Sequence, residues 1–544
     1  MVIIHALAVA MDVDVMIIGA GPTGLMLALE LSLQRTSFRI IDKAIDRSDK
    51  SRALIVQPRS LELFSRHDGL AENFISTGMG GVGVDVYVNK SLATRIDLQD
   101  AGLTDTAFPL PLWISQADTE RLLEERLIAY GHQVERGVRA EDIRQGENGV
   151  SVKHNRPAGD ENVRCRYLIG CDGAHSIVRR SPGFTFEGGV YPQAFFLCDT
   201  RVDWDYPRDR MIMFWGRNLL GAFPINGEIT RLVGSLGTTD AARDPTLEDF
   251  QELVSKLVKG PVKLHDPTWL TRFQLHHRVV NNYRDGCLFV AGDAAHIHTP
   301  VGGQGMNTGI QDAVNLGWKL AAVIRGERSG EYLDSYDTER RPIGEYLLKS
   351  TDRIFTYATS TNVFFVFLRN FFFRWIFPII TRSRGSRTAA SGFMSQFRIR
   401  YRRSPIVQTA TDFRGRSTQA GDRASDGKIK EPSGQKRMLL ELCRGPSYHL
   451  LLFSGLSSAA VGEDKLQAAV IPLLGRLPTG TMTHLICTEG VASNTGYVDV
   501  DGFLHRRYGF DSPGYVLVRP DCHVEHIGLL SSTDEVLSWL DSSA

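Results

Sequence analysis

The sequence has few of the features that mark specialised protein classes. Its 62 basic and 62 acidic residues balance, so no net field attracts the chain to nucleic acid or to acidic membranes. Seven cysteines are scattered over 544 residues without a Cys-x-x-Cys pair, which argues against a disulfide framework or metal site and indicates a reducing, cytoplasmic compartment. Internal repeats and low-complexity tracts are also missing. What remains is a chain long enough for two or three domains with sizeable cores.

Long hydrophobic runs are equally scarce. Residues 1–10 are apolar but lack a basic start and are too short for a signal peptide or spanning helix, so we interpret them as an extension. Residues 363–380 are densely aromatic, but Arg369, Arg374 and Pro378 interrupt them. Each central arginine costs roughly 2.5–3.5 kcal/mol of insertion free energy. We therefore expect a buried or interface helix there, with a peripheral membrane contact as the less favoured alternative.

The stretch from residue 288 to 324 carries the strongest pattern: an apolar strand, a glycine-rich loop and an apolar helical stripe. Asp293 follows the strand, and the loop contains Gly302, Gly303 and Gly305. Glycines leave backbone N–H groups uncovered, and the helix N-terminus adds partial positive charge. The pattern predicts a site for a planar, electron-rich and partly anionic ligand.

A second glycine motif lies near the N-terminus. The apolar strand 13–18 runs into Gly-Ala-Gly-Pro-Thr-Gly at 19–24, a helical stripe follows, and a second strand over 38–41 ends at Asp42. Strand, GxGxxG, helix, strand and acidic residue form the dinucleotide-binding fingerprint in its required order. Asp42 is placed to accept hydrogen bonds from a ribose, so the motif predicts nucleotide binding.

The region between these motifs is predicted to combine helices, hairpins and strands. Residues 138–152 have the pattern of a hairpin. From 195 to 236 the pattern is mostly strands, which predicts an antiparallel sheet inserted between the nucleotide-binding halves. Three aromatic residues of this sheet are available to face a cavity: Phe214, Trp215 and Phe223.

A separate module is predicted from about residue 411. A strand, helix and strand are followed by a hairpin at 514–525, an order that suits a thioredoxin-like domain. Because no Cys-x-x-Cys is present, we expect this module to be redox-inert.

Three motifs stand in one order along the chain: GAGPTG at 19–24, CDG at 171–173, and AGDAAHIHTPVGGQGMNTGIQDAVNLGWKLA at 291–321. With them the sequence resembles the group A flavoprotein monooxygenases, the aromatic hydroxylase family. The resemblance covers nearly the whole chain. It is greatest to members with a C-terminal thioredoxin-like domain, such as phenol hydroxylases and polyketide-tailoring oxygenases.

The resemblance implies an α/β fold with three parts. These are a Rossmann-like FAD-binding domain, an inserted antiparallel-sheet substrate domain and a C-terminal thioredoxin-like domain. The expected boundaries are an N-terminal extension at 1–10, a split FAD-binding domain at 11–182 and 270–350, a substrate sheet at 183–269, a helical connector at 351–410 and the thioredoxin-like domain at 411–544.

The resemblance also implies FAD as cofactor, with NADPH or NADH and O2 as co-substrates. Asp293 would bind the ribityl or pyrophosphate part of FAD, and Asp172 and Gly173 would serve both FAD and the nicotinamide cofactor. Members of this family lack a second dinucleotide-binding fold. The residues expected to bind cofactor are Gly19, Gly21, Pro22, Thr23, Gly24, Asp42, Lys43, Arg52, Gln116, Asp172, Gly173, Gly292, Asp293, Pro300, Gly302, Gly303, Gln304, Gly305, Met306 and Asn307.

The implied reaction is hydroxylation of a phenolic or enolic aromatic substrate through a flavin C4a-hydroperoxide, in secondary metabolism or aromatic catabolism. The partner is then a small aromatic or polyketide molecule, without nucleic acid or membrane, in a monomer or homodimer. Two alternatives stay open: an epoxidase or Baeyer–Villiger oxygenase on the same fold, and a flavin-binding protein without turnover. A halogenase would need a WxWxIP motif, which the sequence lacks.

The catalytic base is not identified by the resemblance. Leu54 stands where phenol hydroxylases of this family carry a carboxylate thought to help deprotonate the substrate. Tyr283 and His298 are the remaining candidates, with a hydrogen-bonded surface tyrosine as the alternative for Tyr283.

Overall fold

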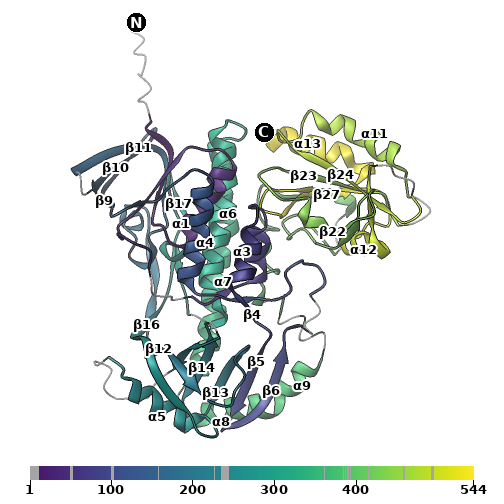
Figure 1. Cartoon of the computed structure of the whole chain (residues 1–544). Helices are drawn as coiled ribbons and strands as arrows, with labels where there is room; N and C mark the ends of the chain where they lie inside the picture. Colours follow the sequence, from purple (N-terminus) through teal and green to yellow (C-terminus); the bar gives the residue numbers. More distant parts are fainter. Residues whose placement is uncertain are drawn as a thin grey trace.

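The chain forms three eight-stranded β-sheets with helices packed around them, together with a small three-stranded sheet. Figure 1 shows this computed structural model, in which the three large sheets occupy three separate regions. The structure describes residues 11–48, 53–99, 103–156, 159–225, 227–234, 244–299, 301–360, 362–383, 385, 388, 391–392, 394–413, 417–456, 460–491 and 495–543. The predicted extension at 1–10 lies outside these residues.

The first sheet contains both glycine motifs at the ends of its parallel strands. Its order is β17-β18-β11-β1-β2-β8, and β9 and β10 form a hairpin beside β11, as the sequence predicts for residues 138–152. Both β11 and β2 pair in parallel with β1, and β18 pairs in parallel with β11. The strands are β1 (Val13–Ile18), β2 (Phe38–Asp42), β8 (Glu135–Arg136), β9 (Arg139–Gly146), β10 (Gly149–Arg156), β11 (Gly159–Gly170), β17 (Arg284–Asp285) and β18 (Leu288–Val290).

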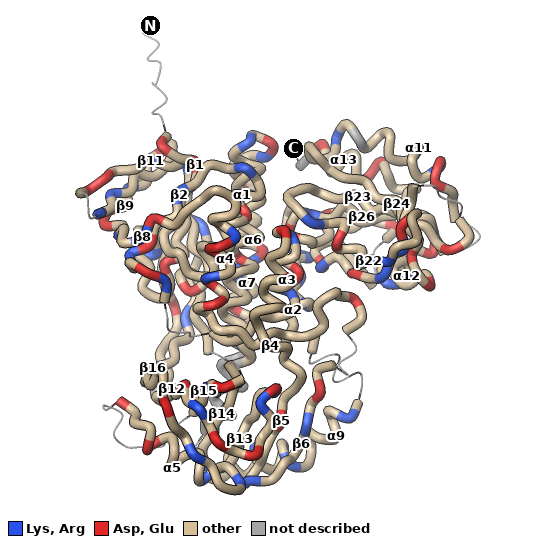
Figure 2. The backbone as a smooth tube through the Cα atoms, in the orientation of Figure 1, with Lys and Arg blue, Asp and Glu red and all other residues tan. Residues whose placement is uncertain are grey.

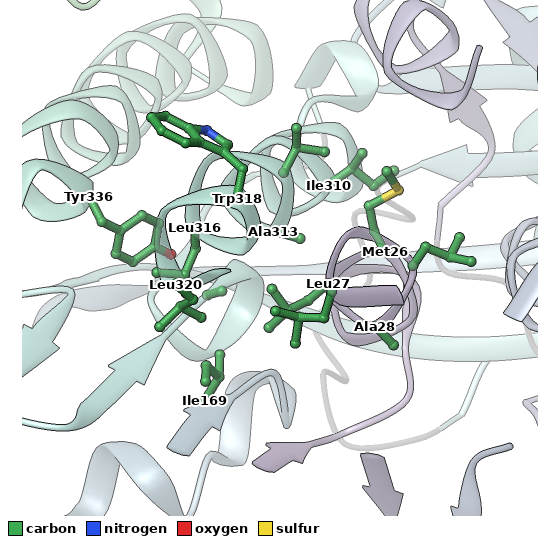
Figure 3. Close-up of a cluster of buried hydrophobic side chains, with 14 of the residues drawn as sticks. Met26, Leu27, Ala28, Ile169, Ile310, Ala313, Leu316, Trp318, Leu320 and Tyr336 are labelled. Carbon is green, nitrogen blue, oxygen red and sulfur yellow. The ribbon is translucent and has the colours of Figure 1, made fainter. Parts of the chain in front are cut away.

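Two helices that follow the glycine motifs pack against each other on this sheet. They are α1 (Pro22–Leu33) and α6 (Gly305–Ile324). Figure 3 shows Leu27 of α1 directed toward Ala313 and Leu320 of α6. The helices can approach closely because Gly317 has no side chain. A Cβ on Gly317 would stand only 2.6 Å from Cβ of Glu30. The packing holds the N-termini of α1 and α6 at one edge of the sheet.

The second sheet is the predicted inserted sheet, with the order β19-β16-β12-β15-β14-β13-β5-β6. Two of its strands, β5 and β6, come from the range assigned to the FAD-binding domain, and the domain boundaries stay a prediction. The strands are β5 (Gly83–Val88), β6 (Ser91–Asp97), β12 (Phe186–Asp203), β13 (Met211–Trp215), β14 (Leu219–Pro224), β15 (Ile229–Gly234), β16 (Lys263–Val280) and β19 (His296–Ile297).

The two faces of the second sheet have different partners. Even-numbered residues of β13, β14 and β15 join Phe250 and Leu253 of α5 (Leu247–Leu257) in one core. On the opposite face, Met211 and Phe223 pack with Leu54 and Ile55 of the first unit. This opposite face is called the inner face below, because it is turned toward the glycine motifs.

The third sheet belongs to the C-terminal module and has the order β20-β27-β26-β23-β24-β25-β21-β22. β23 pairs in parallel with β24 and antiparallel with β26. The predicted α/β class is confirmed, whereas the thioredoxin-like identity of this module stays a prediction. Its main elements are β23 (His449–Phe453), α11 (Glu463–Leu474), β24 (Met482–Thr488), β25 (Tyr497–Asp499), α12 (Phe503–Tyr508), β26 (Gly514–Val518), β27 (Val524–Leu529) and α13 (Thr533–Ser543). The strands at its edges are β20 (Gln408–Thr409), β21 (Lys428–Lys430) and β22 (Lys436–Met438).

The connector begins with the long helix α7 (Asp334–Thr359) and continues through α8 (Val363–Phe371), a π-helical turn η7 (Phe372–Ile376) and α9 (Phe377–Arg382). Of the two expected forms, the buried helix is wrong, because only 6% of the residues in its most apolar window are buried, and the interface helix stays a prediction. By length and composition alone, Val363–Arg382 could cross a membrane. Acidic and basic residues are otherwise interspersed over all three sheets (Figure 2).

Candidate functional site

The first glycine turn lies against the segment Cys171–Gly173. Gly19 follows β1 with a φ of +105°, and a Cβ there would stand 2.4 Å from the carbonyl oxygen of Cys171. Only glycine permits both this backbone angle and this approach. The ends of β1 and β11 therefore meet through bare backbone.

Thr23 connects the first turn to the motif around α6. A Cβ on Gly292 would lie 2.5 Å from Thr23 Oγ1, and a Cβ on Gly309 would lie 2.3 Å from the same atom. The three sequence motifs are thus one continuous surface at the carboxyl ends of parallel strands, where α/β sheets bind ligands. We call this surface the cradle; its described residues are 19–24, 171–173, 292–299 and 302–307.

Contacts from Ile55, Gln57 and Asn307 hold the second glycine turn in place. Gly303 has a φ of +62°, and a Cβ on it would stand 2.8 Å from Ile55 Cδ1. Asn307 Nδ2 donates to the carbonyl oxygens of Ile55 and Gly303, both at 2.8 Å. Gln57 Nε2 donates to the carbonyl oxygen of Gly302 at 3.0 Å. Sequence reasoning missed Gln57, because nothing in its local sequence indicates this distant contact.

Several polar atoms of the cradle are buried without a hydrogen-bond partner in the described part of the chain. They include four acceptors: Asp172 Oδ1, His298 Nε2, Thr299 Oγ1 and Gln304 Oε1. Buried polar atoms are normally paired, and leaving one unpaired costs about 1–3 kcal/mol. All four can accept hydrogen bonds, and FAD offers ring N–H groups and ribityl hydroxyls as donors. The residues present therefore fit FAD.

His298 is a neutral hydrogen-bond acceptor at the N-terminus of α6. Its Nδ1 lies 2.8 Å from the carbonyl oxygen of Thr299, which can only accept, so Nδ1 carries the proton and Nε2 is bare. Burial and the neighbouring His296 lower the pKa of His298 to about 4. A Cβ on Gly305 would lie 3.6 Å from Nε2. The ring is a weak base at neutral pH, but it can accept a hydrogen bond from a ligand.

Asp312 fixes the loop between β18 and α6. Its Oδ2 accepts from the backbone N–H of Gly292 at 3.0 Å and from His296 Nε2 at 2.8 Å, and its Oδ1 accepts from Arg340 Nε at 2.7 Å. Burial opposes ionisation, but Arg340 and His296 outweigh it and lower the pKa of Asp312. Sequence reasoning missed Asp312, although a carboxylate within an apolar helical stripe is a signal for such an anchor.

The remaining predicted cofactor residues surround the cradle. Asp42 Oδ2 accepts from the backbone N–H of Ala20 at 2.7 Å, so its carboxylate is held beside the first turn. Gln116 Oε1 accepts from the backbone N–H of Ala53 at 3.1 Å. Asp293 is exposed at the end of β18. Lys43 is exposed and Met306 is half-buried, whereas Arg52 and Pro300 lie outside the described residues.

The predicted substrate residues are divided between the two faces of the second sheet. Phe214 belongs to the core with α5 and stacks on Tyr87 at 5.4 Å, so its assignment to a cavity is corrected. Trp215 stacks on Phe373 of η7 at 4.7 Å. Phe223 packs beside Leu54 and Ile55 on the inner face, which leaves it as the aromatic residue turned toward the cradle.

The structure places Tyr283 in the core behind the cradle. It is fully buried, and its ring lies 6.1 Å from that of His296. Burial raises the pKa of Tyr283 well above its usual range, which makes the hydroxyl a poor proton donor. The alternative of a hydrogen-bonded surface tyrosine is also wrong, because the buried hydroxyl has no hydrogen-bond partner among the described residues.

A buried arginine on the inner face was not predicted. Arg231 binds both carboxylate oxygens of Asp199 at 2.7 Å, while its Nη1 is buried without a partner among the described residues. Phe223, Arg231, Asp199 and Trp269 are neighbours across four adjacent strands. The sheet register thus puts a buried cation beside Phe223, with one N–H group still available to a ligand.

Comparison with known proteins agrees with this geometry. Residues 12–351 match the family described as FAD binding domain. The 6-methylpretetramide 4-monooxygenase of Streptomyces rimosus is 32% identical over 97% of this chain and 93% of its own length. The pentachlorophenol 4-monooxygenase of Sphingobium chlorophenolicum is 29% identical over 99% of this chain and 98% of its own.

Solved structures show the same fold over the whole chain. The anhydrotetracycline hydroxylase OxyS from Streptomyces rimosus has a TM-score of 0.73 and 30% identity, covering 98% of this chain and 99% of its own. Aklavinone-11 hydroxylase, solved with FAD and aklavinone, has a TM-score of 0.77 and 22% identity, covering 98% and 99%. At that identity the second likeness concerns the fold alone.

Proposed function

Because this chain belongs to the group A FAD-dependent aromatic hydroxylases, we propose that it hydroxylates a multi-ring phenol of the polyketide type with NAD(P)H and dioxygen. The protein is an FAD-binding monooxygenase that acts on phenolic aromatic compounds. In the proposed reaction one oxygen atom enters the ring and the other leaves as water, with two electrons from NAD(P)H. The observation that carries the proposal is the cradle, in which three distant motifs meet around unpaired acceptors.

The cradle residues would hold FAD in an orientation set by the backbone. Gly19, Gly21 and the N-terminus of α1 suit the pyrophosphate, because bare N–H groups and the helix dipole favour negative charge. The N-terminus of α6 gives the same preference for the electron-rich ring system. When bound, FAD supplies the electron transfer and oxygen activation.

The inner face would bind the substrate opposite the cradle. Phe223, Leu54 and Ile55 form an apolar boundary there, which excludes water from the reacting groups. A flat, multi-ring molecule matches this aromatic and aliphatic surface. Relatives whose names give 6-methylpretetramide and anhydrotetracycline as substrates support this choice.

Ionisation of the phenol is assigned to Arg231 and to hydrogen bonding at His298. A free phenol has a pKa of about 10, and its anion is the form rich enough in electrons to react. The unpaired Nη1 of Arg231 would stabilise that anion without a carboxylate at position 54. His298 Nε2 would accept a hydrogen bond from a ligand hydroxyl or N–H, since burial keeps the ring neutral.

The test compares a phenol with its methyl ether. NAD(P)H consumption and product mass are measured across a panel of tetracyclic phenols, and the best substrate is then methylated at the reacting hydroxyl. We expect oxygenation of the phenol by one oxygen atom and binding without oxygenation of the ether. Equal rates for both compounds would exclude phenolate activation and favour an epoxidase or Baeyer–Villiger oxygenase. Flavin binding without substrate-stimulated NAD(P)H oxidation would overturn the proposal.

A further inference from the structure

The connector between α7 and the C-terminal module carries a large exposed apolar surface. We call it the aromatic face, defined by Phe364, Phe367, Leu368, Phe371, Trp375 and Ile379 of α8, η7 and α9. Phe367 is 64% exposed, Trp375 61% and Ile379 66%. Contiguous exposed apolar patches on a folded protein mark interaction sites. In Figure 1 the segment lies beneath β5, β6 and β13, at the end of the molecule away from the N-terminus.

The opposite side of the segment is fastened to the protein. Phe373 stacks on Trp215 at 4.7 Å, and Phe377 packs into the same cluster. Arg369 is buried, donates to the carbonyl oxygen of Gly216 at 2.7 Å and lies over the ring of Trp215. The segment is therefore inverted relative to an ordinary surface helix: its charged Arg369 points inward, whereas Phe364, Phe367 and Phe371 point to solvent.

The charge of this region is unlike that of the rest of the chain. The whole sequence is neutral, but no acidic residue occurs between Asp352 and Asp412. Within residues 363–388 there are five arginines, of which Arg374 and Arg382 are exposed in the described part. Arginines in the same segment as exposed phenylalanine, tryptophan and isoleucine are typical of helices that lie in the interface of anionic bilayers.

We propose that the aromatic face docks the protein on the surface of an anionic lipid bilayer, with α8, η7 and α9 lying in the plane of the interface. Each arginine close to an anionic surface contributes about 1 kcal/mol, and burial of the aromatic side chains adds the apolar part. The segment does not span the bilayer, because Arg369 and Phe373 hold it against the second sheet. This proposal adopts the peripheral membrane contact, which the sequence left as the less favoured alternative to a buried or interface helix.

A second copy of this chain fits the same face less well. A two-fold dimer would place the same surface opposite itself. It would therefore bring together two copies of a segment that contains arginines and no acidic residue. Like charges across an interface are unfavourable. An anionic bilayer satisfies both the apolar residues and the arginines.

The test uses flotation of the full-length, FAD-loaded protein with vesicles. Vesicles of phosphatidylcholine with roughly 30% phosphatidylglycerol, which supply the anionic surface, are compared with pure phosphatidylcholine. We expect binding to the anionic vesicles that weakens at high salt. The triple variant Phe367→Ser, Phe371→Ser and Trp375→Ser should lose binding at least about ten-fold, since each Ser removes exposed apolar area, while it keeps its FAD.

A matched control separates the aromatic face from exposed apolar residues in general. The triple variant Ile75→Ser, Ile128→Ser and Ile471→Ser changes three exposed isoleucines elsewhere and should bind vesicles like the unchanged protein. Absence of vesicle binding by the unchanged protein, or equal binding by the aromatic-face variant, overturns the proposal. If the aromatic-face variant instead converts a dimer to a monomer in light scattering, with no vesicle binding before or after, the face belongs to a dimer.

Discussion

At the scale of single residues, some glycines of the cradle are required by the fold and others by the cofactor. Gly19 is required by the fold, because a Cβ would collide with Cys171. Gly21 is different: its φ is −76°, and a Cβ placed on it would have nothing within 4 Å. A glycine that the protein does not need at this point indicates that a ligand approaches it.

We expect Gly21→Ala to reduce FAD occupancy at least about ten-fold without lowering stability, because the added methyl group fills space reserved for the pyrophosphate. Flavin content by absorbance and thermal unfolding of the FAD-free protein are the measurements. Gly330→Ala, also with open space around it, is the control and should keep full occupancy. Full occupancy in Gly21→Ala would contradict the assignment of the first turn.

Arg231 can be tested through the pH dependence of turnover. The double variant Arg231→Gln and Asp199→Asn removes the buried ion pair without leaving one charge unpaired. We expect the rise of kcat/KM with pH to shift upward by about one unit, because the phenolate loses its nearby cation. A residue with a purely structural role would leave this pH profile in place even if stability fell.

At the scale of elements, the sequence predicts those parts whose constraints are local. Both glycine turns, the strands before them and the hairpin at 138–152 follow from residue spacing, because backbone angles and periodicity act over a few residues. Gln57 binds Gly302 across 245 positions, and Arg231 gains its neighbours only through the register of the second sheet. Such contacts have no local sequence signal, so neither residue could be predicted.

The aromatic segment at residues 363–380 shows a further limit of prediction from sequence. Its composition fits a buried helix as well as an exposed one, and only packing decides between them. The assignment of Phe214 to a cavity is wrong for a related reason, since alternation along β13 shows two faces but not which face meets α5. Phe223, on the neighbouring strand β14, lies on the inner face.

Helix α7 supports a further prediction, because Glu339 holds three elements together. Its carboxylate accepts from Arg519 Nη1 at 2.7 Å and from Lys319 Nζ at 2.8 Å, and all three side chains are buried. Burial opposes ionisation of Glu339, but Arg519 and Lys319 outweigh it and lower its pKa to about 2. The contact joins α7 and α6 to the loop after β26.

We expect Glu339→Gln to destabilise the protein by about 3–5 kcal/mol, because it leaves buried Lys319 without its carboxylate partner and buried Arg519 with Asp521 alone. Urea unfolding near neutral pH measures the change. Glu345→Gln on the same helix removes a partly exposed pair with Arg341 and should cost less than about 1 kcal/mol. Equal effects from the two variants would show that the buried network contributes no more than a surface pair.

At the scale of the whole molecule, buried titratable groups set the response to acid. Burial lowers the pKa of several histidines, five of them to about 3 or 4: His298, His484 and His523 to about 4, and His449 and His526 to about 3. Each binds a proton on unfolding once the pH is below about 6.5. Burial also raises the pKa of several carboxyls, with the largest increases at Asp426, to about 6, and Glu525, to about 7.

The histidine and carboxyl pKa shifts have opposite effects on how the stability of the protein changes with pH. A lowered histidine pKa contributes stability that is present above a pH of about 6.5 and is lost as the pH falls toward about 4. A raised carboxyl pKa contributes stability that is present below the unfolded value of about 4 and is lost as the pH rises through about 6 or 7. Near pH 5.5 unfolding therefore takes up about five protons at histidines and releases about two at carboxyls, a net uptake of about three.

We expect the free energy of unfolding to fall by roughly 4 kcal/mol per pH unit between pH 6 and 5, since each net proton contributes about 1.4 kcal/mol per unit. Four of the five histidines lie between residues 449 and 526, so the C-terminal module should unfold first. Urea unfolding at pH 7.5, 6.5 and 5.5 gives the slope. His484→Gln should reduce it by about one proton, whereas His175→Gln, at an exposed position, should leave it unchanged. A stability that stays constant from pH 7.5 to 5.5 would mean that these histidines reach water in the folded protein.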